Sequence, residues 1–263
     1  MERIDIGGTS IEMSIAGDGP PLVFLHGIDY FAQQRPFLDR LAKEFRVIAP
    51  RHPGFGTSSR PGWMRTVGDI AYLYLDLLDR LALEDVLLVG SSFGGWVAME
   101  LAVRSTARLG GLVLIDTLGL KFGGRGEVEI TDIYTLSAVD AVAHAFADPS
   151  RAPDYAALDE AAVEEVARDR EAAVLYGWRP YMHNPSLKHW LHRLRLPNLV
   201  VWGEKDRIVA PAYGAHLTQM LPGARFVPIA DAGHYPQIEQ PEKVISAIAN
   251  SLRPPDLKGV DRR

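Results

Sequence analysis

The sequence has 263 residues and contains no cysteine. This absence excludes disulfide bonds, a thiolate nucleophile and metal sites with cysteine ligands. The sequence also contains no apolar run as long as a membrane-spanning helix, and the segment from Met1 to Ser10 has acidic residues and glycines where a secretory signal needs an apolar stretch. We therefore expect a cytoplasmic protein that has no membrane partner.

Neither sign of charge predominates. The 28 Lys and Arg residues stand against 33 Asp and Glu residues, the formal net charge is −5, and no long basic run occurs before the last few residues. A nucleic-acid partner is therefore not expected. Hydrophobic residues make up 47% of the sequence, which is enough for a substantial core. The oligomeric state is left open, a homodimer included.

What the sequence does contain is a regular alternation of short apolar runs and amphipathic stretches. The apolar runs are Leu-rich or β-branched without polar alternation, as in strands that are buried on both faces of a parallel sheet. They cover residues 22–26, 46–50, 86–90, 112–116, 199–203 and 225–229, and helical periodicity covers residues 34–44, 67–81, 93–104, 211–220 and 241–252. Preceded by an antiparallel hairpin of Asp5–Ile6 and Ile11–Ile15, this pattern predicts an α/β fold with a doubly wound, mostly parallel sheet.

The alternation stops between Leu118 and Arg195. Two stretches in this region, residues 132–146 and 159–176, have a helical pattern and lie between prolines. We interpret the region as a mostly helical cap placed on top of the sheet. The predicted division of the chain is a core of residues 1–117 and 196–253, a helical cap insertion of residues 118–195, and a polar tail of residues 254–263.

The most informative segment is Gly90-Ser91-Ser92-Phe93-Gly94, which follows an apolar strand and precedes a predicted helix. A Gly-x-Ser-x-Gly sequence in this position predicts a sharp strand-to-helix turn that lifts Ser92 out of the sheet as a nucleophile. Glycine is needed on both sides because side chains there would collide with the backbone of the turn. The helix start adds free N–H groups and a partial positive charge. Ser91 lacks the flanking glycines and is predicted to be structural.

A serine hydroxyl is a poor nucleophile without an adjacent base. His234 follows the last predicted strand and is expected at the carboxyl edge of the sheet, where the strand that carries Ser92 also ends. The base needs a third group that fixes its tautomer. Asp206, shortly after the preceding strand, is the first choice because this architecture orders its triad Ser, Asp, His along the chain. Glu204 and Asp116 remain alternatives.

The oxyanion of an acyl-transfer intermediate needs N–H donors. One donor is expected to be the backbone N–H of Phe93, directly after the serine, and the other that of Ile28, in the loop after the first parallel strand. No metal site is predicted, because His189 and His192 are three residues apart but lack a carboxylate at zinc-ligand spacing. The predicted chemistry needs no cofactor.

Together these segments resemble the α/β-hydrolase superfamily, and within it the cap-bearing branch of serine esterases and carbon–carbon hydrolases. The resemblance extends from His26-Gly27 through a Pro-Gly-x-Gly-x-Ser sequence at Pro53 to Ser58 and on to Gly233-His234. It implies the same three roles for the serine, aspartate and histidine named above. Ser92 stands where the dehalogenase and epoxide-hydrolase branches carry Asp, and Tyr235 stands where ring-cleavage-product hydrolases commonly carry Trp.

The sequence thus predicts a serine hydrolase that cleaves a carboxylic ester of a small molecule through an acyl-enzyme. The alternative among enzymes is hydrolysis of a carbon–carbon bond in a dienone or β-diketone ring-cleavage product by the same residues. An alternative from another class is a small-molecule receptor on the same fold. Of these, ester hydrolysis is the main expectation.

Aromatic side chains of the cap and the core are predicted to contact the substrate, although most aromatic residues at helical spacing only pack. The candidates are Phe31, Trp96, Tyr134, Trp178, Tyr181 and Tyr235. Arg125 and Arg179 are the candidates for binding a substrate carboxylate.

Overall fold

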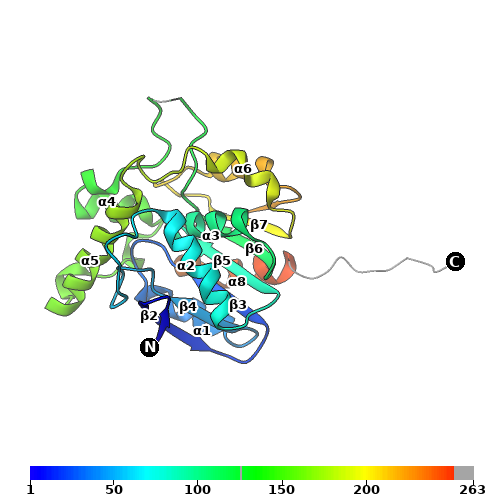
Figure 1. Ribbon diagram of the computed structural model, residues 1–263. Coiled ribbons are helices and arrows are strands. Elements are labelled where there is room, and N and C mark those ends of the chain that lie inside the picture. Colours follow the sequence, from blue (N-terminus) through cyan, green and yellow to red (C-terminus); the bar gives the residue numbers. More distant parts are fainter. Residues whose placement is uncertain (125, 252–263) are drawn as a thin grey trace.

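The computed structural model describes residues 1–124 and 126–251 (Figure 1). The predicted polar tail therefore lies outside the described residues. Within them, one eight-stranded sheet has the strand order β1-β2-β4-β3-β5-β6-β7-β8. The strands are β1 (Glu2–Ile6), β2 (Thr9–Ala16), β3 (Pro21–Leu25), β4 (Arg46–Pro50), β5 (Val86–Ser91), β6 (Leu109–Ile115), β7 (Asn198–Gly203) and β8 (Arg225–Ile229).

Strand direction divides the sheet into two parts. Strand β2 pairs antiparallel with β1 and with β4, whereas β4, β3, β5, β6, β7 and β8 pair in parallel. The parallel strands therefore end at one edge of the sheet, and strand β5 lies near the middle of that edge. This is the doubly wound, mostly parallel sheet that the sequence predicts, and the N-terminal hairpin is also confirmed.

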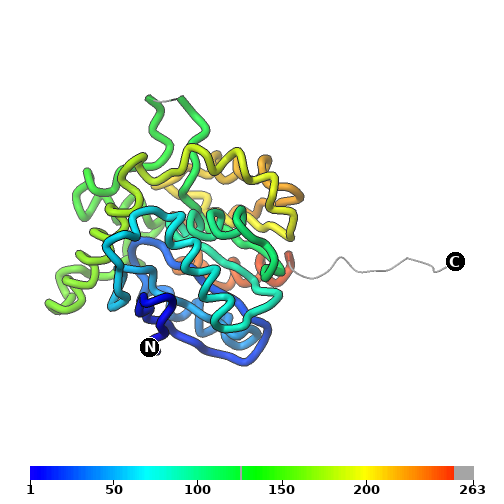
Figure 2. The backbone as a smooth tube through the Cα atoms, viewed as in Figure 1, coloured from blue at the N-terminus to red at the C-terminus, as the bar shows by residue number. Residues whose placement is uncertain are grey.

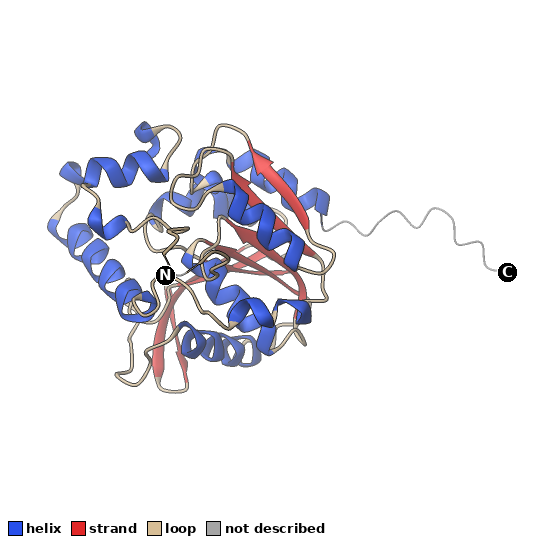
Figure 3. Ribbon diagram, turned by 90° about the horizontal axis from the view of Figure 1, so that it is seen from above, coloured by secondary structure: helices blue, strands red, loops and turns tan. Residues whose placement is uncertain are grey.

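Helices lie on both faces of the sheet (Figure 3). The α-helices are α1 (Arg35–Leu41), α2 (Val67–Arg80), α3 (Phe93–Arg104), α4 (Ala138–Ala145), α5 (Glu160–Gly177), α6 (Pro211–Met220), α7 (Pro236–Glu239) and α8 (Pro241–Ser251). Short 3-10 turns occupy Ala32–Gln34, Ile133–Thr135, Pro149–Arg151, Tyr155–Ala157, Leu187–His189 and Leu191–Arg193.

Two hydrophobic clusters fill the space between the sheet and these helices. On one face, Phe37 of α1 and Ile248 of α8 pack with Phe24 and Val89 of the sheet. On the other face, residues of α2 and α3 pack with residues from the alternate positions of the same strands. Because both faces are covered, β5 is buried throughout and β3 is buried from Leu22 to Leu25, which explains their continuous apolar runs.

Residues 118–195 form the segment that enters between β6 and β7, and we call it the inserted segment. Its helices α4 and α5 lie beside the body that contains the sheet, and Figure 2 shows the chain leaving β6 in a long loop before α4. The helical stretch predicted at residues 132–146 is interrupted, because the side chains of Asp132 and Ser137 each accept a backbone N–H and begin a new helical turn. In the part of the chain that the structure describes, no helix has both the length and the apolar character that a membrane crossing needs.

Candidate active site

Ser92 sits in a strained turn between strand β5 and helix α3. Its backbone has φ +52° and ψ −118°, which residues with side chains rarely adopt. A Cβ on Gly94 would collide with the carbonyl oxygen of Leu25, and a Cβ on Gly90 would collide with the backbone of Gly94. The two flanking glycines are therefore required by the close approach of strand β3 and helix α3, as the sequence motif implies.

Ser92, His234 and Asp206 form a hydrogen-bonded row. The distance from Ser92 Oγ to His234 Nε2 is 2.8 Å, and the distance from His234 Nδ1 to Asp206 Oδ2 is also 2.8 Å. All three side chains are buried, with exposed fractions of 4% or less. A carboxylate can only accept, so Nδ1 donates to Asp206, which leaves Nε2 of the neutral ring to accept the proton of Ser92.

The aspartate and the histidine come from loops at the carboxyl ends of neighbouring strands. Asp206 follows β7, and its Oδ1 accepts the backbone N–H groups of Ile208 at 2.8 Å and Val209 at 3.0 Å. His234 follows β8, and its own N–H donates to the carbonyl oxygen of Ala145 in the inserted segment. The row is thus held from the sheet on one side and from the inserted segment on the other.

Two backbone N–H groups beside Ser92 are free to receive an anion. Among the described residues, neither the N–H of Ile28 nor that of Phe93 donates a hydrogen bond to another protein group. Phe93 is the first residue of helix α3, so its N–H carries the partial positive charge of the helix start. Gly27 allows the close approach of the Ile28 loop, because a Cβ there would lie 3.1 Å from the Cβ of Ser92.

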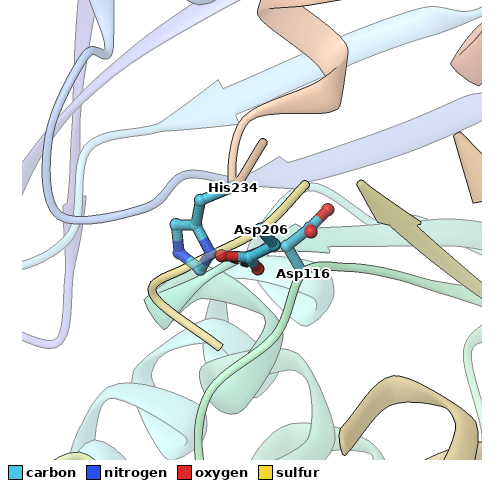
Figure 4. A group of neighbouring side chains, drawn as sticks. All are labelled: Asp116, Asp206 and His234. Atoms are coloured by element: carbon cyan, nitrogen blue, oxygen red, sulfur yellow. Dashed lines mark hydrogen bonds and ion pairs between the residues drawn. The ribbon is translucent and has the colours of Figure 1, made fainter. Parts of the chain in front are cut away.

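The alternative carboxylates of the sequence occupy different places. Glu204 is exposed to solvent. Asp116 is fully buried beside Asp206 (Figure 4), and the oxygen or nitrogen atoms of Asp116, Asp206 and His234 lie within 4.8 Å of one another. Among the described residues, these three side chains form the one cluster with enough neighbouring ligand atoms to hold a metal ion. However, the 2.8 Å from His234 to Asp206 is shorter than the separation of two ligands on a tetrahedral ion bound at about 2.0–2.2 Å from each.

A small, mostly apolar cavity opens onto Ser92 and His234. The core contributes Ile28, Asp29, Tyr30, Ile208 and Tyr235, and the inserted segment contributes Leu118, Ile130, Thr131, Ile133, Ala141, Ala145, Arg170, Tyr181 and Met182. Its free space is about 30 Å³, which accommodates one or two water molecules.

The predicted substrate contacts are only partly on this cavity. Tyr181 and Tyr235 line it, whereas Phe31, Trp96, Tyr134 and Trp178 do not. In this arrangement of the chain those four side chains lie away from the cavity, and their contact with a substrate stays a prediction.

Each of the four has a different packing partner. Phe31 lies under the guanidinium of Arg51, 4.3 Å from the ring centre. Trp96 donates from Nε1 to Glu100, and the hydroxyl of Tyr134 donates to the carbonyl oxygen of Arg170. Trp178 is 49% exposed and packs edge-on against Tyr181.

Sequence reasoning missed an ion pair in the cavity. Arg170 of helix α5 donates from Nε to Asp29 Oδ1 at 2.9 Å, and both residues line the cavity. Tyr30, the residue after Asp29, has φ +65° and also lines the cavity. The sequence offered no signal for this pairing across 141 positions. Of the predicted carboxylate binders, Arg179 lies on a separate surface depression and Arg125 lies outside the described residues.

Arg51 fastens helix α5 of the inserted segment to the core. It follows β4, its side chain is buried, and it donates to Asp169 at 2.5 Å and to Glu165 at 2.9 Å. Asp169 also accepts the N–H of Gly56. Burial raises the pKa of Asp169 to about 6, and the Arg51 charge and the Gly56 N–H oppose that rise. Arg51 is therefore the counterion that lets this carboxylate be buried between core and inserted segment.

Replacing Arg51 with methionine is expected to lower the free energy of unfolding by about 3–5 kcal/mol, because Asp169 then loses its buried counterion. Urea denaturation followed by circular dichroism measures the loss. Arg168→Met is the matched control, since Arg168 is exposed on the same helix and, among the described residues, donates only to the carbonyl oxygen of Gly56. It is expected to cost about 1 kcal/mol or less. Equal losses in the two variants would show that the Arg51 pair does not hold the helix.

Residues 22–247 match the family model described as the alpha/beta hydrolase family. The sequence is 30% identical over 281 aligned residues to 2-hydroxymuconate semialdehyde hydrolase of Pseudomonas sp. (strain CF600), and the alignment covers 98% of this chain and 95% of that protein.

Two solved structures are similar over nearly the whole chain. One is 2-hydroxy-6-oxo-6-phenylhexa-2,4-dienoate hydrolase from Rhodococcus sp. strain RHA1, with a TM-score of 0.76, 25% identity, and coverage of 96% of this chain and 98% of that chain. The other is a thermophilic esterase from Thermogutta terrifontis, with a TM-score of 0.75, 26% identity, and the same coverage of 96% and 98%.

Proposed function

Because the chain belongs to the alpha/beta hydrolase family, we propose that it hydrolyses a carbon–carbon bond next to a carbonyl group in a small 2-hydroxy-6-oxo-dienoate. The observation that carries the proposal is the hydrogen-bonded row of Ser92, His234 and Asp206 at the floor of a cavity covered by the inserted segment. The choice of bond is supported by the two relatives whose names describe hydrolases of such compounds. It replaces ester hydrolysis, the main expectation from the sequence.

In the proposed reaction Ser92 Oγ attacks the carbonyl carbon and passes its proton to His234 Nε2. The backbone N–H groups of Ile28 and Phe93 stabilise the oxyanion. The carbon–carbon bond then breaks, its electron pair moves through the conjugated double bond to the 2-oxo oxygen of the substrate, and His234 returns the proton to the dienolate that leaves. Water, activated by the same histidine, releases the acid from Ser92. Asp206 keeps Nδ1 protonated throughout and stabilises the charged ring.

Carbon is a poor leaving group unless its electron pair is delocalised. The proposed substrate provides that delocalisation once the proton of its 2-hydroxy group has moved to the carbon next to the carbonyl group, because the resulting 2-oxo form accepts the electron pair through its conjugated double bond. This chain therefore has to hold the substrate beside Ser92 and His234. The cavity is suited to that task because its wall is mostly apolar and both Tyr30 and Tyr235 are buried against it.

Ester hydrolysis is the second candidate, and a specific observation favours it. A dienoate carries a carboxylate, whereas the cavity's guanidinium, Arg170, is already paired with Asp29. A neutral ester needs no such cation. The thermophilic esterase among the solved neighbours also supports this alternative. The negative charge of Asp29 therefore disfavours the anionic dienoate and has no such effect on a neutral ester.

A substrate comparison separates the two candidates. The wild-type protein is expected to have a higher kcat/KM for 2-hydroxy-6-oxo-hexa-2,4-dienoate than for a short p-nitrophenyl ester, with Ser92→Ala as the background control. Asp29→Asn removes a negative charge next to Arg170 and is expected to lower KM for the dienoate about tenfold, which corresponds to about 1.4 kcal/mol, without changing KM for the neutral ester.

Glu164→Gln is the control for net charge, because Glu164 is exposed on the same helix as Arg170. It is expected to leave both KM values unchanged. A kcat/KM that is higher for the ester in the wild-type protein would favour the second candidate. An unchanged dienoate KM in Asp29→Asn would mean that Arg170 does not contact the substrate carboxylate.

A further inference from the structure

Asp116 is a buried carboxyl group that the proposed reaction does not use. It directly follows β6, has no exposed surface, and has a φ of +43°, which is uncommon for a residue other than glycine. Its Oδ1 accepts the backbone N–H of Gly203 at 2.9 Å. Its Oδ2 is also buried, and no N–H or O–H of the described residues donates to it. Oδ2 of Asp116 is thus a buried oxygen without a hydrogen-bond donor among the described residues.

The carboxyl group of Asp116 is next to a second buried carboxyl group, that of Asp206. Asp116 lies beside Asp206 and His234 (Figure 4), and atoms of the three side chains lie within 4.8 Å of one another. Two adjacent carboxylates that are shielded from water cannot both be ionised at low cost. The proton belongs on one of them.

The donors around Asp206 identify which one holds it. Asp206 accepts three N–H groups, from Ile208, Val209 and His234, and these favour its charged form. Asp116 accepts one. Burial, and then the negative charge of Asp206, raise the pKa of Asp116 well above its ordinary value; Glu239 acts in the same direction and the Gly203 N–H opposes it.

We propose that Asp116 is a neutral carboxylic acid in the resting protein and donates its proton from Oδ2 to Asp206. A carboxylate has about four acceptor sites, and this donor would occupy the one that the three N–H groups leave free. Asp116 acts only through Asp206 and is therefore a positioning residue. It fixes the plane of the Asp206 carboxylate toward His234 and ties the end of β6 to the loop after β7. Its role in turnover rests on the proposed function, whereas its protonation does not.

Asp116→Asn tests the protonation directly. An asparagine has the shape of a protonated aspartate, with an oxygen to accept from Gly203 and an N–H to donate to Asp206. The infrared difference spectrum of wild-type protein minus Asp116→Asn at pH 7 is expected to contain the carbonyl stretch of a neutral carboxylic acid. A difference spectrum with the bands of a carboxylate instead would overturn the proposal.

The pH dependence of unfolding provides a second, independent measure. The native protein holds a proton that the unfolded chain, with an aspartate pKa of about 3.9, releases above that pH. Raising the pH therefore destabilises the wild-type protein relative to Asp116→Asn. The ratio of their unfolding constants, wild type over variant, is expected to increase about tenfold per pH unit from pH 5 to pH 7. A ratio that does not change with pH contradicts a neutral Asp116.

Glu239→Gln is the matched control for this measurement. Glu239 is also buried, but both of its oxygens accept backbone N–H groups, from Gly233 at 2.6 Å and from Asp148 at 2.9 Å. For Glu239→Gln, the ratio of the unfolding constant of the wild type to that of the variant is expected to stay constant from pH 5 to pH 7. A slope at Glu239 equal to that at Asp116 would show that the slope does not report the Asp116 proton.

Turnover tests the positioning role. Asp116→Leu removes the donor, and kcat is expected to decrease about 10-fold to 100-fold, the size of the effect seen when the hydrogen-bond partner of a metal-ligating side chain is removed. The acidic limb of the pH profile is expected to move to higher pH, because an Asp206 that has lost a donor stabilises the charged histidine more strongly. Asp116→Asn is expected to restore both properties. A kcat that falls as much in Asp116→Asn as in Asp116→Leu would show that the positioning role is wrong. A Ser92→Ala variant as active as the wild type would instead show that the proposed function is wrong.

Discussion

Replacing Ser92 with alanine is expected to lower kcat by about a million-fold, the size of the loss seen when the serine or histidine of another triad is removed. The reason is geometric: Ser92 Oγ lies 2.8 Å from His234 Nε2, and no acyl-enzyme forms without that oxygen. Steady-state kinetics measures the loss on whichever of the two substrates, the dienoate or the p-nitrophenyl ester, has the higher kcat/KM in the wild-type protein. Unimpaired turnover in Ser92→Ala would refute the proposed mechanism.

Ser91 provides the matched control one residue away. It is fully buried at the end of β5, and its Oγ accepts a hydrogen bond from Gln237 Nε2 at 2.9 Å. Ser91→Ala leaves that amide without a partner, so stability is expected to fall by about 1–3 kcal/mol. Turnover per folded molecule is expected to remain. A loss of kcat in Ser91→Ala as large as that in Ser92→Ala would mean that the turn itself, and not the Ser92 hydroxyl, had been disrupted.

Replacing Asp206 with asparagine is expected to lower kcat about ten-thousand-fold, as the equivalent change does in a serine protease triad. The asparagine N–H would face His234 Nδ1 at the position where a carboxylate oxygen now accepts. The ring would then protonate at Nε2, the nitrogen that has to accept the serine proton. The pH profile of kcat in the variant, together with its unfolding free energy, separates this tautomer effect from a loss of folding.

Glu204→Gln is the control for Asp206→Asn. Glu204 lies in the same loop but is exposed. It is expected to leave kcat unchanged. If Glu204→Gln were as damaging as Asp206→Asn, the orienting role would belong to the other carboxylate of the loop.

The sheet and the serine turn could be predicted because their signals are local. A strand buried on both faces has to be apolar throughout, and the turn at Ser92 has to have glycine on both sides. Both requirements can be read within a few residues. The strand ends also place His234 and Asp206 at one edge of the sheet, so three distant segments converge without any knowledge of their side-chain contacts.

The lining of the cavity could not be predicted, because it depends on which way side chains of the inserted segment face. Trp178 and Tyr181 are three residues apart, yet the first is half exposed and the second lines the cavity. The pair of Asp29 and Arg170 joins residues 141 positions apart. The sequence indicates Asp116 only as an alternative to Asp206. Its position beside Asp206 follows from the pairing of β6 with β7, which the sequence does not specify.

The expected effects on turnover all depend on Ser92 being an activated nucleophile. Reaction with a fluorophosphonate, followed by mass spectrometry of the digested protein, tests it most directly. We expect one adduct per chain, on the peptide that contains Ser92, and none in Ser92→Ala. An adduct on a different residue, or no adduct under conditions that fully label a known serine hydrolase, would contradict the account.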